Sequence, residues 1–192
     1  MASEILYVKN MVCNRCIQGV KEELLRLGIE VQDVQLGEVR LTQPVSVYKL
    51  DQVREVFADR GFEILEDSSS KLIEQIKTAI IDLVHNPEVI VNQNVSDYLE
   101  DRVGKDYSYL SNLFSSVENI TIERYLILQK VEKVKELLIY DELTLSEISY
   151  KMDYSSVQYL SGQFRKVTGM SPSEFKKLTK KERLPLDKVV PQ

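Results

Sequence analysis

Residues 144–175 have the sequence TLSEISYKMDYSSVQYLSGQFRKVTGMSPSEF, and this stretch decides how the carboxyl-terminal part of the chain folds. Apolar residues recur in it at helical spacing and polar breaks interrupt them twice, which predicts three short helices. Capping boxes of the form Ser/Thr-x-x-Glu occupy residues 144–147 and 171–174, Ser155 is expected to cap the middle helix, and Gly169 is expected to end it. Two helices joined by a turn of about four residues form a helix-turn-helix, the geometry that places a recognition helix in a DNA groove. A plain amphipathic helical hairpin is the alternative.

The same stretch resembles the carboxyl-terminal signature of AraC/XylS-type transcription regulators. In that family an Ile-Ala pair, a Gly-Phe turn, a recognition helix reading Tyr-Phe-Ser-Arg-x-Phe-Lys-Lys, a Gly and a Ser/Thr-Pro-x-x-Tyr/Phe closure follow one another. The corresponding positions here hold Ile148-Ser149, Asp153-Tyr154, YLSGQFRK at 159–166, Gly169 and SPSEF at 171–175. The resemblance implies an all-α domain with two helix-turn-helix motifs and sequence-specific binding to double-stranded DNA.

A second, related half precedes this stretch. Apolar spacing predicts helices over 72–85, 95–103 and 107–117, and then a long helix over 122–140 that joins the two halves. Asn86-Pro87 is expected to break the first of these helices, and Ser70 to cap it. The segments YLSNLF at 109–114 and YLSGQF at 159–164 are parallel, so the halves read as an internal repeat.

The two expected recognition helices differ in charge. The first offers hydroxyl and amide groups but no basic residue beyond the neighbouring Lys105, whereas the second keeps Arg165 and Lys166, which we expect to hold phosphates. Glutamine can pair with adenine through two hydrogen bonds. Tyr159 can either touch the groove or pack inside the domain. The candidate DNA-binding residues are Ser108, Ser111, Asn112, Ser156, Gln158, Tyr159, Gln163, Arg165 and Lys166.

Residues 1–67 read as a separate unit. Strands are expected near 5–8, 29–36, 38–42 and 62–65, with helices over 17–27 and 50–60. The order is β-α-β-β-α-β, which is the ferredoxin-like arrangement. The fold class is therefore a two-domain α+β protein.

The motif Met11-Val12-Cys13-Asn14-Arg15-Cys16 lies between the first strand and first helix of this unit. A helix amino terminus lowers thiol pKa values and so favours metal-binding thiolates. Two thiolates without further ligands suit Cu(I), while a structural Zn(II) site needs four ligands and no second pair lies nearby, so Zn(II) is the second candidate. A thioredoxin-like redox pair, or thiols without a present role, are the alternatives.

This unit also resembles the heavy-metal-associated domains of copper chaperones and metal-transporting ATPases, whose loop reads Gly-Met-x-Cys-x-x-Cys. Asn10 replaces the first glycine here, and Gly61-Phe62 matches the glycine-aromatic pair before the last strand. The resemblance implies a soft metal ion at Cys13 and Cys16. The only histidine, His85, lies outside the unit, and we expect it to be solvated or to stabilise a helix end.

Composition limits the function classes. A chain of 192 residues permits one or two domains, and no stretch reaches 18 apolar residues. The amino terminus lacks a basic region followed by an apolar run, so we expect no signal peptide and a cytoplasmic location. The formal net charge is −5, but residues 120–192 carry 13 basic and 10 acidic side chains. Phosphate contacts are therefore expected in the last third.

These observations predict the following organisation: a heavy-metal-associated-like domain over 1–67, a linker over 68–70, an AraC-like DNA-binding domain over 71–180 and a basic, flexible tail over 181–192. The predicted function is DNA-binding transcription regulation with Cu(I) as the input and no catalysis. A metal-donor protein is a further expected partner, and a membrane is not. The alternatives are a metal-binding or protein-interaction module that binds DNA weakly, and a thiol-redox-responsive regulator.

Overall fold

The computed structural model describes residues 4–86, 94–178 and 182–189. These residues fall into two compact units, one within 1–82 and 91–113 and the other within 83–90 and 114–192. In the ranges that the structure describes, no helix is both long and apolar enough to cross a membrane. The expected break at Pro87 lies outside the described residues.

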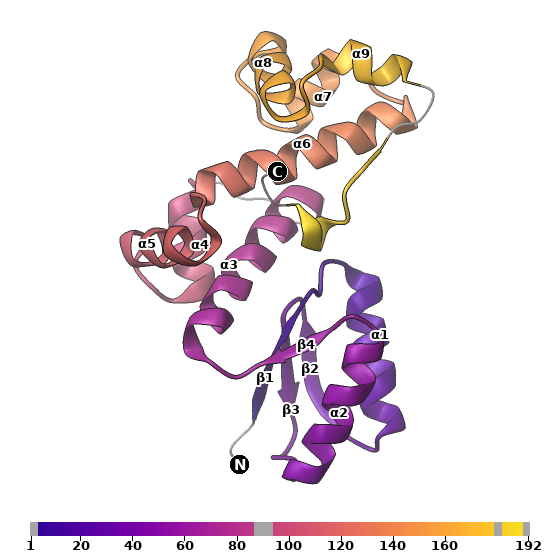
Figure 1. Ribbon diagram of the computed structural model, residues 1–192, viewed down its shortest axis with the longest axis vertical. Coiled ribbons are helices and arrows are strands. Elements are labelled where there is room, and N and C mark those ends of the chain that lie inside the picture. The colour runs from indigo at the N-terminus through magenta and orange to yellow at the C-terminus, as the bar shows by residue number, and fades with distance from the viewer. Residues whose placement is uncertain (1–3, 87–93, 179–181, 190–192) are drawn as a thin grey trace. The chain divides into compact units, whose positions relative to one another are not determined.

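The first unit contains a four-stranded antiparallel sheet, formed by β1 (Ile5–Lys9), β2 (Val31–Gln35), β3 (Glu38–Leu41) and β4 (Glu63–Leu65). The strand order is β2-β3-β1-β4, so β1 pairs with both β3 and β4. The helices α1 (Asn14–Arg26) and α2 (Val47–Asp59) pack on each other and on the sheet (Figure 1). The small sheet with helices confirms the α+β class.

Helix α2 begins earlier than its apolar spacing predicts. The side-chain oxygen of Ser46 accepts a hydrogen bond from the Lys49 main-chain N–H at 3.4 Å and so caps the helix. Val53 and Phe57 of α2 are fully buried in the core, beside β-strand residues such as Val39. The extra first turn is thus stabilised by its cap and not by the core.

Helix α3 (Ser68–His85) includes residues 68–70, which the sequence suggested were a linker. The carboxylate of Asp67 accepts from the main-chain N–H of Ser70 at 2.8 Å, so Asp67 takes the capping role expected of Ser70. Hydrogen bonds from Ser70 lower the pKa of Asp67. An aspartate cap also suits the positive end of the helix dipole.

The first helix-turn-helix consists of α4 (Val95–Val103) and α5 (Tyr107–Glu118). Gly104 ends α4 in the left-handed conformation, with φ of 70°. The hydroxyl of Tyr98 donates to the Ala79 carbonyl of α3 at 3.4 Å, and Arg102 pairs with Asp82 of α3 at 3.3 Å. These contacts attach α4 to α3 within the first unit.

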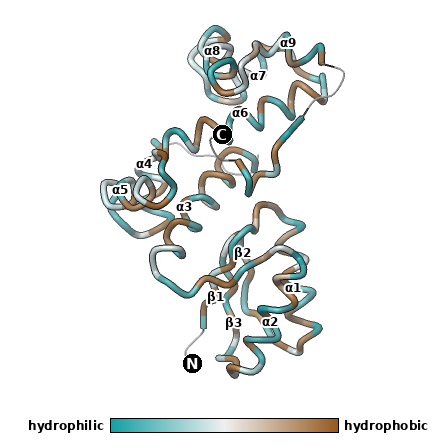
Figure 2. Tube along the Cα trace, in the orientation of Figure 1, coloured by the Kyte–Doolittle hydropathy of each residue, from teal (hydrophilic) through white to brown (hydrophobic). Residues whose placement is uncertain are grey.

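The second unit is built on α6 (Ile122–Tyr140), whose predicted bounds are confirmed. Its apolar stripe is buried, and Figure 2 shows apolar and polar residues alternating along the helix. Three shorter helices follow: α7 (Leu145–Lys151), α8 (Val157–Thr168) and α9 (Pro172–Lys177). The buried residues shared by these helices are Val131, Val134, Leu137, Leu138, Ile148, Met152, Leu160, Phe164 and Phe175.

Residues 182–189, which belong to the segment predicted to be a flexible tail, contact α6. The Glu132 carboxylate accepts from the Leu184 N–H at 3.1 Å, and Gln129 Nε2 donates to the Leu186 carbonyl at 3.0 Å. Val189 is 2% exposed. Such polar partners on α6 cannot be recognised from sequence because they pair across more than 50 positions. Lys180, at the end of the predicted DNA-binding domain, and Lys181, the first residue of the predicted tail, lie outside the described residues.

Candidate nucleic-acid interface and metal site

The second helix-turn-helix forms around a strained turn. Both capping boxes are present, at Thr144 of α7 and at Ser171 of α9, as the sequence predicts. Between α7 and α8, Asp153 has φ of 53°, and Tyr154 follows with its N–H bonded to the Ser149 carbonyl at 2.9 Å. Asp153 stands where the resembled family has glycine, and an aspartate tolerates this conformation better than most side chains.

Helix α8 is capped by Ser156 and not by the predicted Ser155. The Ser156 hydroxyl accepts from the Tyr159 N–H at 3.1 Å. Two adjacent serines satisfy the same sequence rule, and the turn geometry decides between them. Ser156 was also predicted to contact DNA, and this stays a prediction, because the cap uses the hydroxyl oxygen as an acceptor and leaves its O–H as a donor.

The outward side of α8 carries the other predicted contacts of this half. Gln158, Arg165 and Lys166 are exposed, and Tyr159 is 53% exposed, so Tyr159 does not pack inside the domain. Gln163 is half-buried, and its Nε2 donates to the Tyr159 hydroxyl at 3.1 Å. The structure therefore brings two basic side chains and two amides onto one short helix.

The outward side of α5 is uncharged. Ser111 is half-buried and Asn112 exposed, but the Ser108 hydroxyl donates to the Asp106 carboxylate at 2.5 Å and so belongs to the start of the helix. These bonds from Ser108 lower the pKa of Asp106. Among the side chains of α5, only that of Glu118, the last residue, is charged at pH 7. This helix has no group that neutralises a phosphate.

Further basic residues lie on α9. Lys176 pairs with Asp141, the residue that ends α6, whereas Lys177 is exposed. The pairing offsets part of the positive charge that the sequence suggested near this helix. Arg183 likewise pairs with Glu136 of α6 at 2.7 Å. Arg165 and Lys166 of α8 and Lys177 of α9 therefore contribute exposed positive charge, as does Lys151 of α7.

The predicted thiol pair lies at the start of α1. Cys13 is the residue that precedes the helix and is exposed, and Cys16 is half-buried, with 3.6 Å between the two Sγ atoms. Burial raises the pKa of Cys16, which differs from the lowering expected from the helix dipole. One ion can contact both sulfurs because a metal–thiolate bond is about 2.3 Å long.

The surroundings of this pair supply no further ligand cluster. In the described ranges no group of three or more His, Cys, Asp or Glu side chains could hold a metal ion. Asn10, which replaces a family glycine, has φ of 71°, and its side-chain amide donates to the Gly61 carbonyl at 2.8 Å. The donor set therefore fits an ion that accepts two thiolates, such as Cu(I).

His85 is neither solvated nor a helix-end cation. Its Nε2 lies 3.1 Å from Oε1 of Gln129, whose side chain is completely buried. Burial, reinforced by the charge of Lys133, lowers the pKa of His85 to about 4. The ring is therefore neutral at pH 7 and is part of the packing around α6.

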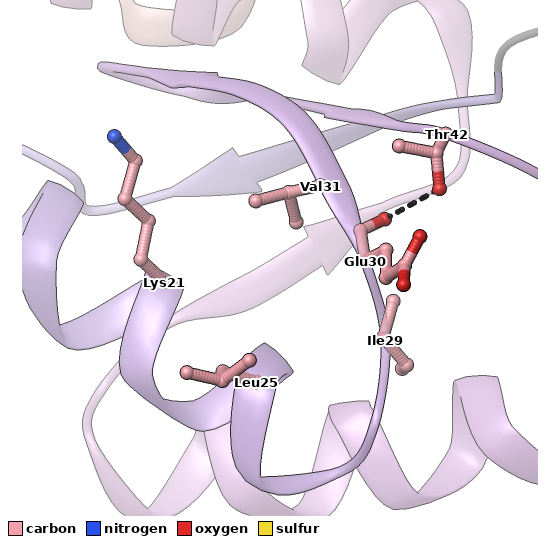
Figure 3. A pocket seen from close by; sticks show the side chains of 6 residues that line it. All are labelled: Lys21, Leu25, Ile29, Glu30, Val31 and Thr42. Atoms are coloured by element: carbon pink, nitrogen blue, oxygen red, sulfur yellow. Dashed lines mark hydrogen bonds between the residues drawn. The ribbon is translucent and has the colours of Figure 1, made fainter.

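A pocket of about 350 Å³ opens between α1 and β2 (Figure 3). Its floor is mainly apolar, and the Thr42 hydroxyl donates to the Glu30 carbonyl at 3.1 Å. Neither cysteine lines it. The lining residues are Lys21, Leu25, Ile29, Glu30, Val31 and Thr42.

Comparison with known proteins identifies the class. A family model described as a helix-turn-helix domain matches residues 99–178. This matched segment contains α5 and α8, the two helices that the sequence predicts to be recognition helices.

The matched relatives are operon regulators. The chain is 34% identical over 80 residues to the xylose operon regulatory protein of Escherichia coli K12. This alignment covers 42% of this chain and 20% of the relative. It is 28% identical over 116 residues to the Msm operon regulatory protein of Streptococcus mutans, covering 59% of this chain and 40% of the relative. The chain thus spans less than half the length of either. The relatives are regulators and not enzymes, as the sequence predicted.

Among solved structures, part of the chain matches the DNA-binding domain of AdpA, a global transcriptional factor, in complex with a target DNA. The TM-score is 0.43 at 19% identity, covering 58% of this chain and 91% of that one.

Three residues that support the candidate sites were not predicted from the sequence. Glu74 of α3 accepts a hydrogen bond from the N–H of Asn10, and Lys130 of α6 donates to the carbonyl of Met152. Thr78 of α3 lies against Gly37. The sequence offered one signal for Glu74 and Lys130. Each is a charged residue on a helix side that is otherwise apolar, and charged residues are seldom buried without a partner.

Proposed function

We propose that the protein is a sequence-specific DNA-binding transcription regulator in which α8 supplies most of the affinity for double-stranded DNA. The observation that carries this proposal is the contrast between the two recognition helices. The outward side of α8 presents Arg165 and Lys166 beside two glutamines, whereas the exposed side chains of α5 include no basic residue. Phosphate neutralisation provides a large share of protein–DNA affinity, so the basic helix dominates.

Enrichment of genomic DNA fragments by the full chain tests this proposal at low and at moderate salt. We expect one family of sites to be enriched by the wild type and to be lost in the Arg165→Ala/Lys166→Ala double variant. Lys151→Ala is the matched control, because Lys151 is an exposed lysine of α7. Failure of the wild type to enrich any site at any salt would leave the protein-interaction module as the better description.

A soft metal ion is the proposed input, with Cu(I) before Zn(II), and residues 1–67 are the proposed ferredoxin-like, heavy-metal-associated domain. The thiolates of Cys13 and Cys16 would hold the ion, and a bound ion would link these two residues. The 3.6 Å separation of the sulfurs, the exposure of Cys13 and the β2-β3-β1-β4 strand order support this assignment. A metal-donor protein would reach the site through the exposed Cys13.

Helix α3 offers a route from the thiol loop to the first helix-turn-helix. Its residues 71, 74 and 78 recur at helical spacing, and they lie against β1, the residue after β1 and the turn between β2 and β3. Lys71 lies 5.4 Å from the ring centroid of Tyr7, and Glu74 accepts from the N–H of Asn10 at 2.9 Å, three residues before Cys13. The same helix bonds α4 through Ala79 and Asp82. A change in the loop would therefore be transmitted to α3 and α4.

Hydrogen exchange of the full chain, with and without Cu(I) under anaerobic conditions, tests this input. We expect slower exchange in peptides from the thiol loop and from α3 and α4, and we expect Glu74→Ala to remove the effect on α3 and α4 alone. Glu55→Ala, an exposed glutamate of α2, is the control. Slower exchange only in the loop would retain metal binding and reject the route, whereas no change anywhere would reject the metal input.

A thiol-redox input is the second candidate, because the same sulfur separation favours it. It predicts a reversible Cys13–Cys16 disulfide that changes DNA affinity in the absence of metal. Comparison of reduced, oxidised and Cys13→Ser/Cys16→Ser proteins on one enriched DNA site distinguishes the two inputs.

A further inference from the structure

The turn that precedes α8 is held by a lysine from another helix. Nζ of Lys130, on α6, donates to the carbonyl of Met152 at 2.9 Å and lies 5.3 Å from the ring centroid of Tyr154. Lys130 is half-buried, and this burial lowers its pKa, while the nearby charge of Asp153 acts in the opposite direction. A cation over an aromatic face attracts it more strongly when both are partly desolvated. The ammonium group therefore restrains both the end of α7 and the Tyr154 ring.

An aromatic pair connects this turn to the recognition helix. The rings of Tyr154 and Tyr159 have centroids 6.0 Å apart at an interplanar angle of 55°. Tyr154 is half-buried, and burial raises its pKa to about 12. Tyr159 is 53% exposed, so one ring is fixed in the domain while the other reaches solvent. Tilted pairs at this separation are a favourable aromatic arrangement.

Gln163 continues the chain of contacts that runs from Lys130 through Tyr154 to Tyr159. Its Nε2 donates to the Tyr159 hydroxyl at 3.1 Å, one helical turn along α8. A glutamine amide has two N–H groups and one carbonyl oxygen. With one N–H bonded to Tyr159, the other N–H and Oε1 remain, and adenine in the major groove presents the complementary N7 acceptor and N6 donor.

We propose that Lys130 is a positioning residue for base recognition by α8, and this inference rests on the DNA-binding function proposed above. Lys130 fixes Tyr154, Tyr154 supports Tyr159, and Tyr159 holds the amide of Gln163 in the orientation that selects adenine. Tyr159 and Gln163 are the specificity-determining pair. Arg165 and Lys166 contribute to affinity on any sequence, because phosphates carry no base identity.

Selection of DNA sites from a random double-stranded pool tests this proposal, with sequencing of the sites bound by each full-length variant. We expect Gln163→Ala to reduce the preference for adenine at one position by about 5- to 150-fold. Tyr159→Phe keeps the ring and removes the hydroxyl, so the preference at that same position falls roughly 2- to 10-fold. In the Gln163→Ala background, Tyr159→Phe has no further effect there.

Lys130→Met keeps an apolar side chain of similar length and is expected to weaken the same single position, without a uniform loss at the others. Lys151→Met is the control and leaves the profile unchanged, whereas Lys166→Ala lowers affinity for all sequences. If Lys130→Met does not fold, Tyr159→Phe still tests the contact between Tyr159 and Gln163 on which the proposed role of Lys130 depends, because Tyr159 is exposed.

Three results would overturn the inference. The first is an unchanged base profile in Tyr159→Phe, and the second is a uniform loss of affinity in Lys130→Met. The third is a guanine preference opposite Gln163, which would place the amide in the reverse orientation. A wild type that selects no site rejects the DNA-binding function itself, and that result is distinct from all three.

Discussion

Asn10 and Asp153 occupy the positions at which the two resembled families carry glycine, and both have positive φ, at 71° and 53°. Only short polar side chains approach glycine in tolerating this region. The replacements are therefore compatible with the loops that the sequence suggested. The sequence predicted a turn at Asp153 and a loop that begins at Asn10, but the positive φ of these residues is seen only in the backbone structure.

Asp153→Ala should destabilise the second unit by about 1 kcal/mol, because alanine has no side chain that offsets the left-handed conformation. Asp153→Gly should retain the stability of the wild type to within about 0.5 kcal/mol, since glycine adopts this conformation freely. Urea denaturation of both variants measures the difference. Equal destabilisation by alanine and glycine would show that the Asp153 carboxylate, and not the backbone, is what matters.

His85 makes folding sensitive to mild acid. Its pKa is about 4 in the folded chain and near 6.5 when unfolded, so the unfolded state binds the proton more readily. Stability should therefore be complete above pH 6.5 and decline as the pH falls toward 4, with a loss of about 2 kcal/mol between pH 7 and pH 5.

Denaturation curves at pH 7 and pH 5 measure this loss for the wild type and for His85→Gln. Because the chain has one histidine, the variant should show a much flatter dependence in this range. An unchanged pH dependence in His85→Gln would assign the titration to carboxylates instead.

At the scale of elements, periodicity and caps predicted most of the structure. The bounds of α4 and α6 agree with the apolar spacing, because each ends at a left-handed residue and begins at a side-chain cap. The starts of α2 and α3 were misplaced, since Ser46 and Asp67 extend these helices with residues that face solvent. Periodicity cannot detect a turn that buries nothing.

Helix α8 offers a direct test of capping. Ser156→Ala should cost about 1 kcal/mol of stability, because the Tyr159 N–H loses its side-chain acceptor. Ser155→Ala is the matched control and should stay within about 0.5 kcal/mol of the wild type. Thermal unfolding of the two alanine variants compares them. A larger loss of stability in Ser155→Ala than in Ser156→Ala would show that Ser155 is the cap, as the sequence predicted.

At the scale of the whole molecule, the candidate site was only partly predictable. The residue types on α8 and the thiol pair could be read from motifs, because both depend on local spacing. The contacts of Lys130 and Glu74 join residues 22 and 64 positions apart, and no local pattern encodes such pairs. The predicted domain boundary at 68–70 stays a prediction, although those residues lie within α3.

The central claim is that α8 dominates DNA binding, and the salt dependence of affinity for one enriched site tests it most directly. The slope of log affinity against log salt should become shallower by about two in Arg165→Ala/Lys166→Ala, because two phosphate contacts are removed. Ser111→Ala/Asn112→Ala on α5 should leave the slope unchanged. A slope unaltered by the α8 substitutions, or reduced by those in α5, would contradict the account.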